Sequence, residues 1–197
     1  MVSAGVTSPL RPSLLLHVCC ASCATHVIES LLPSYEVIGF FFNPNISPKA
    51  EFLRRLKDAC RVCGHYHVRL WIPAYRNDLW SSAVRGLEDR PEGGERCAVC
   101  FRLRLEETAR CALRSSIGSI ATTLTVSPHK NAEVINEVGR SLAAQYSIAF
   151  LDRDFKKKNG FLRSVSRSKE LGLYRQSYCG CPYSHKNPHV PKRGERR

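Results

Sequence analysis

The chain has 197 residues, and its 30 lysines and arginines exceed its 17 acidic residues to give a formal net charge of +13. This length is enough for one hydrophobic core that folds without disulfides. No apolar run approaches the length of a transmembrane helix, and no convincing secretory signal is present. We therefore expect a cytoplasmic protein with no membrane association, whose ten cysteines are reduced or bound to metal.

The positive charge is concentrated toward the C-terminus. One stretch holds Arg153, Lys156, Lys157, Lys158, Arg163, Arg167 and Lys169. We expect residues 1–12 to be a disordered N-terminus, residues 13–185 to form a single α/β domain, and residues 186–197 to be a basic, flexible tail. The charge favours a polyanion such as RNA through counterion release, although a basic surface that serves only solubility stays open as the alternative.

Five short apolar runs, continuous rather than alternating, predict β-strands. They span residues 14–18, 37–42, 67–72, 119–124 and 148–151. Such runs are typical of strands that are buried on both faces of a parallel sheet.

Helical patterns fall between these runs. We expect Ser22 to cap a helix that ends before Pro33, and Pro48 to open a second helix that Gly64 ends. Further helices are predicted over residues 101–114, 131–144 and 159–171. Strands that alternate with helices predict an α/β fold, a parallel sheet with helices on both faces and functional groups beyond the carboxyl ends of the strands.

Seven of the ten cysteines lie in three short clusters, and the first cluster directly follows the first predicted strand. The seven are Cys19, Cys20, Cys23, Cys97, Cys100, Cys179 and Cys181. Cys20 and Cys23 alone would fit a thioredoxin-like redox pair, and four thiolates would fit a structural zinc site. The surplus of thiolates favours an iron–sulfur cluster with a second metal beside it. Cys60, Cys63 and Cys111 are expected to lie elsewhere.

Five segments carry a further signal when they are taken in order. They are CCASC at 19–23, FNPNI at 42–46, RCAVCFRLRL at 96–105, TTLTVSPHKN at 122–131 and ELGLYRQSYCGC at 170–181. Together they resemble the motifs of the QueH family of epoxyqueuosine reductases, and the resemblance extends from residue 14 to residue 184. Five ordered motifs are far more specific than any single pair of cysteines.

The resemblance implies a Rossmann-like sheet related to the HUP-type PP-loop ATPases, in a metal-binding reductase domain. It implies reduction of epoxyqueuosine to queuosine at the wobble position of tRNA, the final step of queuosine biosynthesis. It also implies a 4Fe–4S cluster with an additional mononuclear iron beside it. The ligands that it implies are Cys19, Cys20, Cys97, Cys100, Cys179 and Cys181, with Cys23 as a further candidate. Which thiolate binds which metal, and which molecule donates the electrons, stay open.

Other residues are candidates for proton transfer and for RNA contact. Asp154 and His129 are the candidate proton donors to the departing epoxide oxygen. The candidate RNA-contacting residues are Arg102, Lys130, Tyr174, Arg175, Tyr178, Lys156, Lys157 and Lys158. The two tyrosines either stack on an unpaired anticodon base or cover the cluster from water. Arg104 either contacts the RNA or is a charge on a helix surface.

Two other functions stay open. An ATP-using tRNA-modifying enzyme of the PP-loop kind would need a Ser/Gly-rich phosphate loop after the first strand, where this chain has cysteines. A zinc-stabilised RNA-binding module without enzymatic activity would need only four thiolates and would hold zinc alone.

Overall fold

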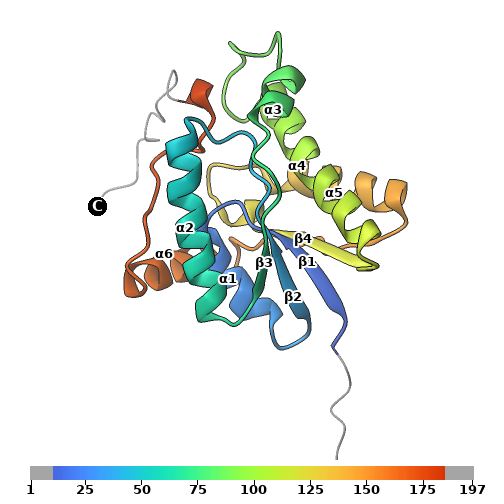
Figure 1. Cartoon of the computed structure of the whole chain (residues 1–197), viewed down its shortest axis with the longest axis vertical. Helices are drawn as coiled ribbons and strands as arrows, with labels where there is room; N and C mark the ends of the chain where they lie inside the picture. The colour runs from blue at the N-terminus through green and yellow to red at the C-terminus, as the bar shows by residue number, and fades with distance from the viewer. Residues whose placement is uncertain (1–10, 185–197) are drawn as a thin grey trace, which may run out of the picture.

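The computed structural model describes residues 11–184, which form a five-stranded sheet covered by helices (Figure 1). The strands are β1 (Ser13–His17), β2 (Glu36–Phe40), β3 (Arg69–Trp71), β4 (Ser119–Thr122) and β5 (Ala149–Phe150). The α-helices are α1 (Ala21–Leu31), α2 (Lys49–His65), α3 (Asn77–Ala83), α4 (Glu95–Arg114), α5 (Ala132–Tyr146) and α6 (Gly160–Glu170). Short 3-10 helices lie at η1 (Leu124–Val126) and η2 (Pro182–Ser184).

All strand pairs are parallel, and the order across the sheet is β3-β2-β1-β4-β5. Leu15 of the central strand β1 pairs with Ile38 of β2 on one side and with Ile120 of β4 on the other. The chain therefore adds strands outward from β1 in one direction, crosses back, and adds β4 and β5 in the other direction. In such sheets the loops on either side of the reversal diverge, and ligands bind in the crevice beyond the carboxyl ends of the strands.

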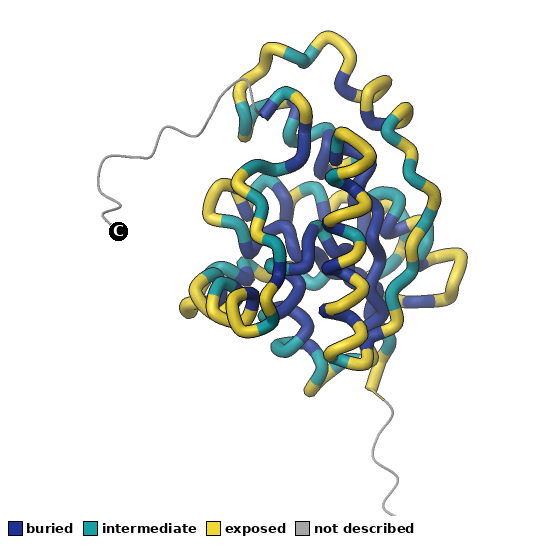
Figure 2. Tube along the Cα trace, turned by 60° about the vertical axis from the view of Figure 1, so that its left-hand side comes forward, coloured by how far each residue is buried: buried dark blue, intermediate teal, exposed yellow. Residues whose placement is uncertain are grey.

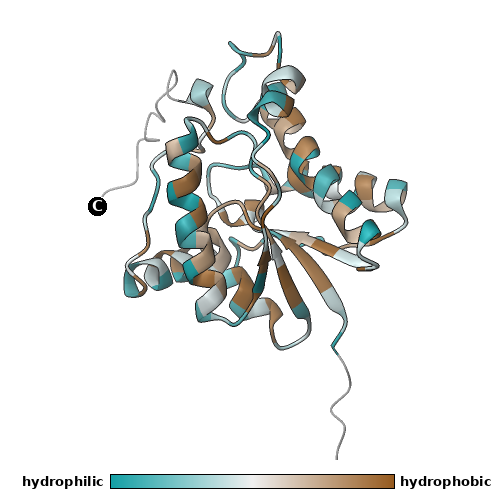
Figure 3. Ribbon diagram, in the orientation of Figure 1, coloured by the Kyte–Doolittle hydropathy of each residue, from teal (hydrophilic) through white to brown (hydrophobic). Residues whose placement is uncertain are grey.

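Different helices cover the two faces of the sheet, and the side chains of β1 alternate between them. Leu14 and Leu16 pack with α1 and α2, whereas Leu15 packs with Ile120 and with α4. Helix α6 packs on α1, and α5 packs on α4. Figure 3 shows that the strands are largely apolar, and Figure 2 shows the buried interior. The arrangement confirms the predicted α/β fold, a parallel sheet with helices on both faces.

Two helix starts differ from the predictions. Cys20, not Ser22, occupies the N-cap of α1, and the Ser22 hydroxyl is buried without a hydrogen-bond partner among the described residues. Helix α4 begins at Glu95, well before the predicted start at residue 101. The sequence pattern did not reveal its first turn, because the charged residues Glu95 and Arg96 interrupt the apolar periodicity. In the structure Arg96 is nevertheless buried. Cys97 therefore lies on a helix and not in a loop before one.

Helix α2 also differs at both ends, and α3 was not predicted. Pro48 is the N-cap residue that precedes α2, and Gly64 lies inside a helix that continues to His65. Gly64 has no positive φ to end the helix, so helical backbone carries on through it. Helix α3 is short and buries only Trp80, which leaves too little periodicity for a sequence signal.

The predicted disordered N-terminus and basic tail lie outside the described residues, apart from Arg11 and Pro12. The Pro12 carbonyl accepts a hydrogen bond from the Glu36 N–H at 3.0 Å, which extends the pairing of β1 with β2. In the described part of the chain, none of the helices combines the length and the hydrophobicity that crossing a bilayer requires.

Candidate metal centre

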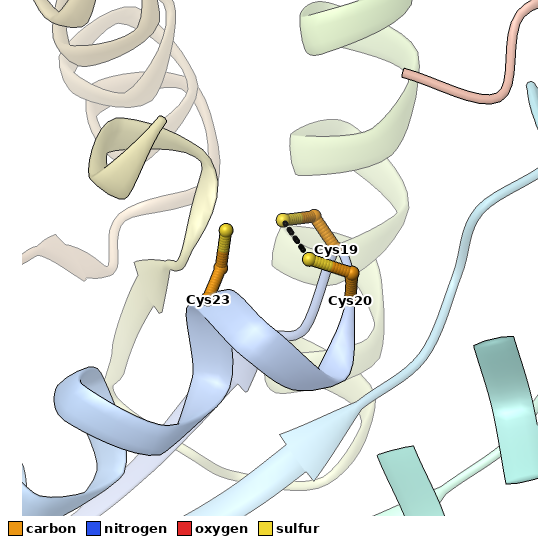
Figure 4. Close-up of side chains that lie close together, drawn as sticks. All are labelled: Cys19, Cys20 and Cys23. Carbon is orange, nitrogen blue, oxygen red and sulfur yellow. Dashed lines mark hydrogen bonds between the residues drawn. The ribbon is translucent and has the colours of Figure 1, made fainter. Parts of the chain in front are cut away.

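The first cysteine cluster lies where β1 ends and α1 begins. Cys19 follows the strand, Cys20 is the N-cap of α1, and Cys23 lies in the first turn of the helix. The three sulfur atoms lie within 4.8 Å of one another, and the Sγ atoms of Cys19 and Cys20 are 3.8 Å apart. Figure 4 shows the three side chains clustered where the strand meets the helix. Three thiol sulfurs at this separation can share one metal ion.

Thr123, the residue that follows the neighbouring strand β4, holds Cys19 by two contacts. Its hydroxyl oxygen accepts a hydrogen bond from the Cys19 N–H at 2.9 Å and donates to the Cys19 sulfur at 3.1 Å. β1 and β4 flank the reversal of strand order, so the cluster lies at the crevice that the topology creates.

Within this cluster the pKa of Cys19 is lowered, whereas the pKa values of Cys20 and Cys23 are raised. Hydrogen bonds from the Cys20 and Cys23 thiols hold the pKa of Cys19 well below its usual range, although burial opposes this effect. The hydrogen bond between Cys20 and Cys19 raises the pKa of Cys20 to about 11, and a separate hydrogen bond between Cys23 and Cys19 raises the pKa of Cys23. A thiolate supported by two thiols is the donor that soft metal ions bind.

The second group of cysteines comes from α4 and from the segment after α6. Cys97 and Cys100 lie on successive turns of α4, and the Gly93 N–H donates a hydrogen bond to the Cys97 sulfur at 3.2 Å. Burial raises the pKa of both thiols. A hydrogen bond from Cys181 holds the pKa of Cys179 well below its usual range, and the nearby ammonium of Lys130 lowers it further.

Two adjoining pockets gather all seven of these cysteines. The larger pocket, of roughly 200 Å³, is lined by Cys19, Cys20, Cys23 and Cys179. The smaller pocket, of roughly 30 Å³, is lined by Cys97, Cys100, Cys179 and Cys181. Both pockets are also lined by Glu92, Arg104, His129 and Lys130. The pockets therefore form one crevice in which Cys179 belongs to both cysteine groups.

The remaining three cysteines lie outside this crevice. Cys63 is on the buried face of α2 and packs in the core, Cys60 is exposed, and Cys111 packs on the opposite face of the sheet.

Two cations offset the negative charge of the crevice. Burial of Lys130 lowers its pKa, but Cys179, Cys19 and Cys23 together outweigh burial and raise it, so the ammonium stays protonated. Arg104 is 4% exposed, which makes its interpretation as a helix-surface charge wrong. Its guanidinium donates a hydrogen bond to the Asn43 side chain.

Several of the predicted RNA-contacting residues lie at the larger pocket, and others do not. Lys130, Arg175 and Tyr178 line it, together with Phe161 of α6. One face of the Tyr178 ring is covered by the guanidinium of Arg55, 4.9 Å from the ring centroid. Tyr174 lines neither pocket, and the guanidinium of Arg54 lies 3.6 Å from its ring centroid.

The candidate acid Asp154 and the basic residues beside it line neither pocket, although the Lys156 ammonium donates to the carbonyl of Lys130, a lining residue, at 3.4 Å. The Asp154 carboxylate forms an ion pair with Lys156 at 3.2 Å, and neither residue lines a pocket. Lys157 and Lys158 are exposed on the same loop. Arg102 is exposed and donates a hydrogen bond to Gln145 of α5 at 3.2 Å.

Three residues that the sequence-based reasoning did not select support this crevice. Asn43 and Arg55 are buried and hydrogen-bond to segments that carry cysteines, and Glu92 lines both pockets. Asn43 lies in the FNPNI motif, which could have marked it, whereas Arg55 gives no sequence signal beyond a charge on an amphipathic helix.

Comparison with known proteins identifies the family. Residues 14–187 match the family model described as epoxyqueuosine reductase QueH. The chain belongs to the QueH family. It is 42% identical over 183 residues to epoxyqueuosine reductase QueH of Streptococcus pyogenes serotype M1, covering 90% of this chain and 72% of that protein. It is 34% identical over 175 residues to epoxyqueuosine reductase QueH of Thermotoga maritima, covering 87% of this chain and 90% of that protein.

A third QueH relative, from Staphylococcus epidermidis, is 37% identical over 182 residues, covering 88% of this chain and 76% of that protein. Membership of the QueH family confirms the resemblance drawn from the five motifs. It makes this chain an enzyme, an oxidoreductase of the epoxyqueuosine reductase class.

Proposed function

We propose that the chain reduces epoxyqueuosine to queuosine at the wobble position of tRNA, with a 4Fe–4S cluster and an adjacent mononuclear iron held by its cysteines. The observation that carries this proposal is the convergence of seven cysteines from three segments on two adjoining pockets. A structural zinc site takes four thiolates, so seven exceed what zinc alone requires.

The chemistry of the donor set fits iron and sulfide. Buried thiolates are the ligands of iron–sulfur clusters, and hydrogen bonds to their sulfurs tune the reduction potential. Thr123 and Gly93 supply such hydrogen bonds, to Cys19 and to Cys97. The ligands we propose are Cys19, Cys20, Cys97, Cys100, Cys179 and Cys181, with Cys23 as the further ligand.

Removal of an epoxide oxygen to leave an alkene consumes two electrons and two protons and releases water. Side chains cannot supply the electrons; a bound iron–sulfur cluster would supply them, and a bound iron would act as a Lewis acid toward the epoxide oxygen. The chain itself supplies protons and positive charge. We assign proton delivery to His129, which lines both pockets. Asp154 ranks second as a proton donor, because it lines neither pocket and its carboxylate forms an ion pair with Lys156.

The larger pocket suits a nucleobase that has left the anticodon stack. Tyr178 and Phe161 give it aromatic walls, and Arg175 and Lys130 give it positive charge. Proteins recognise unpaired bases by aromatic and guanidinium surfaces of this kind. Lys157 and Lys158 are exposed on the loop before α6 and are proposed to contact tRNA phosphates.

Anaerobic purification followed by metal analysis and electron paramagnetic resonance tests this proposal. We expect brown protein with several iron atoms per chain, a resonance signal after chemical reduction, and conversion of epoxyqueuosine in tRNA detected by mass spectrometry of digested nucleosides. Colourless protein that contains only zinc and converts nothing would favour the zinc-stabilised RNA-binding module. Tight ATP binding by protein without iron would favour the PP-loop-like ATP-using enzyme.

A further inference from the structure

The segment that carries the last two cysteines runs along α2 in the opposite direction to the helix. We name residues 171–181 the strap. Figure 1 shows it in orange-red beside α2, leading from the end of α6 to η2. None of its residues belongs to a helix or strand, so its position depends on contacts with its neighbours.

A row of side chains on α2 holds the backbone of the strap. Arg61 donates hydrogen bonds to the carbonyls of residues 171 and 172, and Asp58 accepts one from the Tyr174 N–H at 2.7 Å. These residues and Arg55 are spaced three apart, so they lie along one face of α2. Each holds a different part of the strap.

Arg55 holds the end of the strap that carries the cysteines. Its guanidinium donates to the Tyr178 carbonyl at 3.2 Å and to the Cys179 carbonyl at 3.0 Å. Its Nε–H donates to the Glu51 carboxylate at 2.7 Å. The Arg55 side chain is only 2% exposed, so its guanidinium is shielded from water. A buried guanidinium with all three nitrogens paired is rigid, and it fixes the carbonyls that it binds.

The turn between the two cysteines is shaped around the same guanidinium. Gly180 has a φ of +100°, and a Cβ at this position would lie 3.0 Å from Arg55 Nη1 and 3.0 Å from Ile46 Cγ1. Its carbonyl accepts a hydrogen bond from the Ser47 N–H at 2.9 Å. Glycine allows both the backbone conformation and the close approach of Arg55.

We propose that Arg55 is a positioning residue that sets the sulfurs of Cys179 and Cys181 against the other cysteines of the crevice. It acts through the backbone carbonyls of residues 178 and 179, and its side chain also lines the larger pocket. The expected effect of Arg55 on the geometry of the metal centre rests on the proposed function. The claim that Arg55 holds the cysteine-bearing end of the strap rests on its own hydrogen bonds and does not depend on the proposed function.

Arg55→Met and Arg55→Lys test the inference, with Arg61→Met as the matched control. Lysine keeps the charge beside Glu51 but lacks the planar fork that binds two carbonyls. Arg61 is the same residue type on the same helix face, and its contacts lie at the far end of the strap. The first readout is hydrogen exchange by mass spectrometry on full-length protein purified anaerobically.

In Arg55→Met we expect amides of residues 174–181 to exchange about tenfold faster, because two charge-assisted hydrogen bonds to the strap are lost. Arg55→Lys should show a smaller change at the same amides. In Arg61→Met the faster exchange should be confined to residues 171–174. Unchanged exchange in β1 and α1 would show that each variant is folded. If both Arg55 variants lost protection in β1 and α1 as well, Arg55 would stabilise the whole fold and not the strap in particular, which would overturn the inference.

The second readout is the resonance spectrum of the reduced protein. We expect Arg55→Met to change its line shape and to lower the iron content, and Arg61→Met to match the unmodified protein. Equal exchange and equal spectra in Arg55→Met and the unmodified protein would overturn the inference. If the protein holds no iron, the proposed function fails, while the exchange of the strap still decides whether Arg55 positions it.

Discussion

The side-chain oxygen of Asn43 accepts a hydrogen bond from the guanidinium of Arg104. The side-chain nitrogen of Asn43 donates to the Val18 carbonyl at 2.9 Å. Val18 immediately precedes Cys19, and Arg104 lies one turn beyond Cys100 on α4. One buried amide therefore connects the backbone that carries the first cysteine cluster with the helix that carries part of the second.

Asn43→Leu should destabilise the protein by about 3 kcal/mol. The substitution keeps a similar side-chain volume but leaves the Val18 carbonyl and an Arg104 N–H buried without partners, at roughly 1–3 kcal/mol each. The measurement is urea unfolding of anaerobically purified protein, compared at equal metal content because bound metal adds stability.

Asn77→Ala is the matched control for this prediction. Asn77 also donates one hydrogen bond, to the Pro44 carbonyl at 2.7 Å, but it is only half-buried. We expect it to lower the unfolding free energy by about 1 kcal/mol. Equal losses of unfolding free energy in the two variants would show that the two hydrogen bonds of Asn43 contribute no more than the single one donated by Asn77.

Gly180→Ala should be far more harmful than Gly172→Ala, although both glycines have positive φ. At Gly172 the φ is +58° and no atom lies within 4 Å of an added Cβ, so alanine costs about 1 kcal/mol of backbone strain. At Gly180 the added Cβ would also press on Arg55 and Ile46, each at 3.0 Å. We expect Gly180→Ala to lose most of its iron when purified anaerobically, and Gly172→Ala to retain it. Full iron content in Gly180→Ala would contradict the tight packing of this turn.

Much of the fold could be predicted because local pattern and tertiary environment agree. The continuous apolar run of β1 reflects a strand with a core on each face, and Asn131 caps α5 by accepting from the Glu133 N–H at 2.9 Å. The first turn of α4 was missed because its charged residue Arg96 is buried, donating to the Glu88 carbonyl at 2.8 Å. That burial depends on a loop whose position the sequence does not reveal.

The candidate site was predictable where residue type alone limits the role. Clustered cysteines indicate metal or redox chemistry wherever they lie. Arg55 and Asn43 could not be selected in this way, because an arginine on a helix is usually solvated and a loop asparagine usually serves a turn. Their roles arise from the strap and from α4, which reach them only in the folded chain.

Cys179→Ala should remove most of the bound iron together with the reductase activity. Cys179 is the cysteine that lines both pockets, so its loss affects both groups of ligands. Cys60→Ala is the control, because Cys60 is exposed on α2 and lines neither pocket. Iron per chain and the conversion of epoxyqueuosine in tRNA are the measurements. Full activity in Cys179→Ala would remove Cys179 from the proposed ligands.

Binding of tRNA should weaken with added salt, and the exposed lysines before α6 should account for part of this dependence. Each phosphate contact contributes about 0.7–0.9 to the slope of log affinity against log salt concentration. The double variant Lys157→Gln, Lys158→Gln should therefore lower the slope by about 1.5. Fluorescence anisotropy with labelled tRNA across a salt series gives this slope.

The control for charge is Lys49→Gln, Lys57→Gln, which removes the same two charges from exposed positions on α2. We expect its slope to match that of the unmodified protein, because counterion release depends on lysines that meet phosphates and not on net charge. If the two double variants lower the slope equally, binding responds to overall charge and Lys157 and Lys158 make no specific contact. If neither lowers it, the loop before α6 lies outside the tRNA-binding surface.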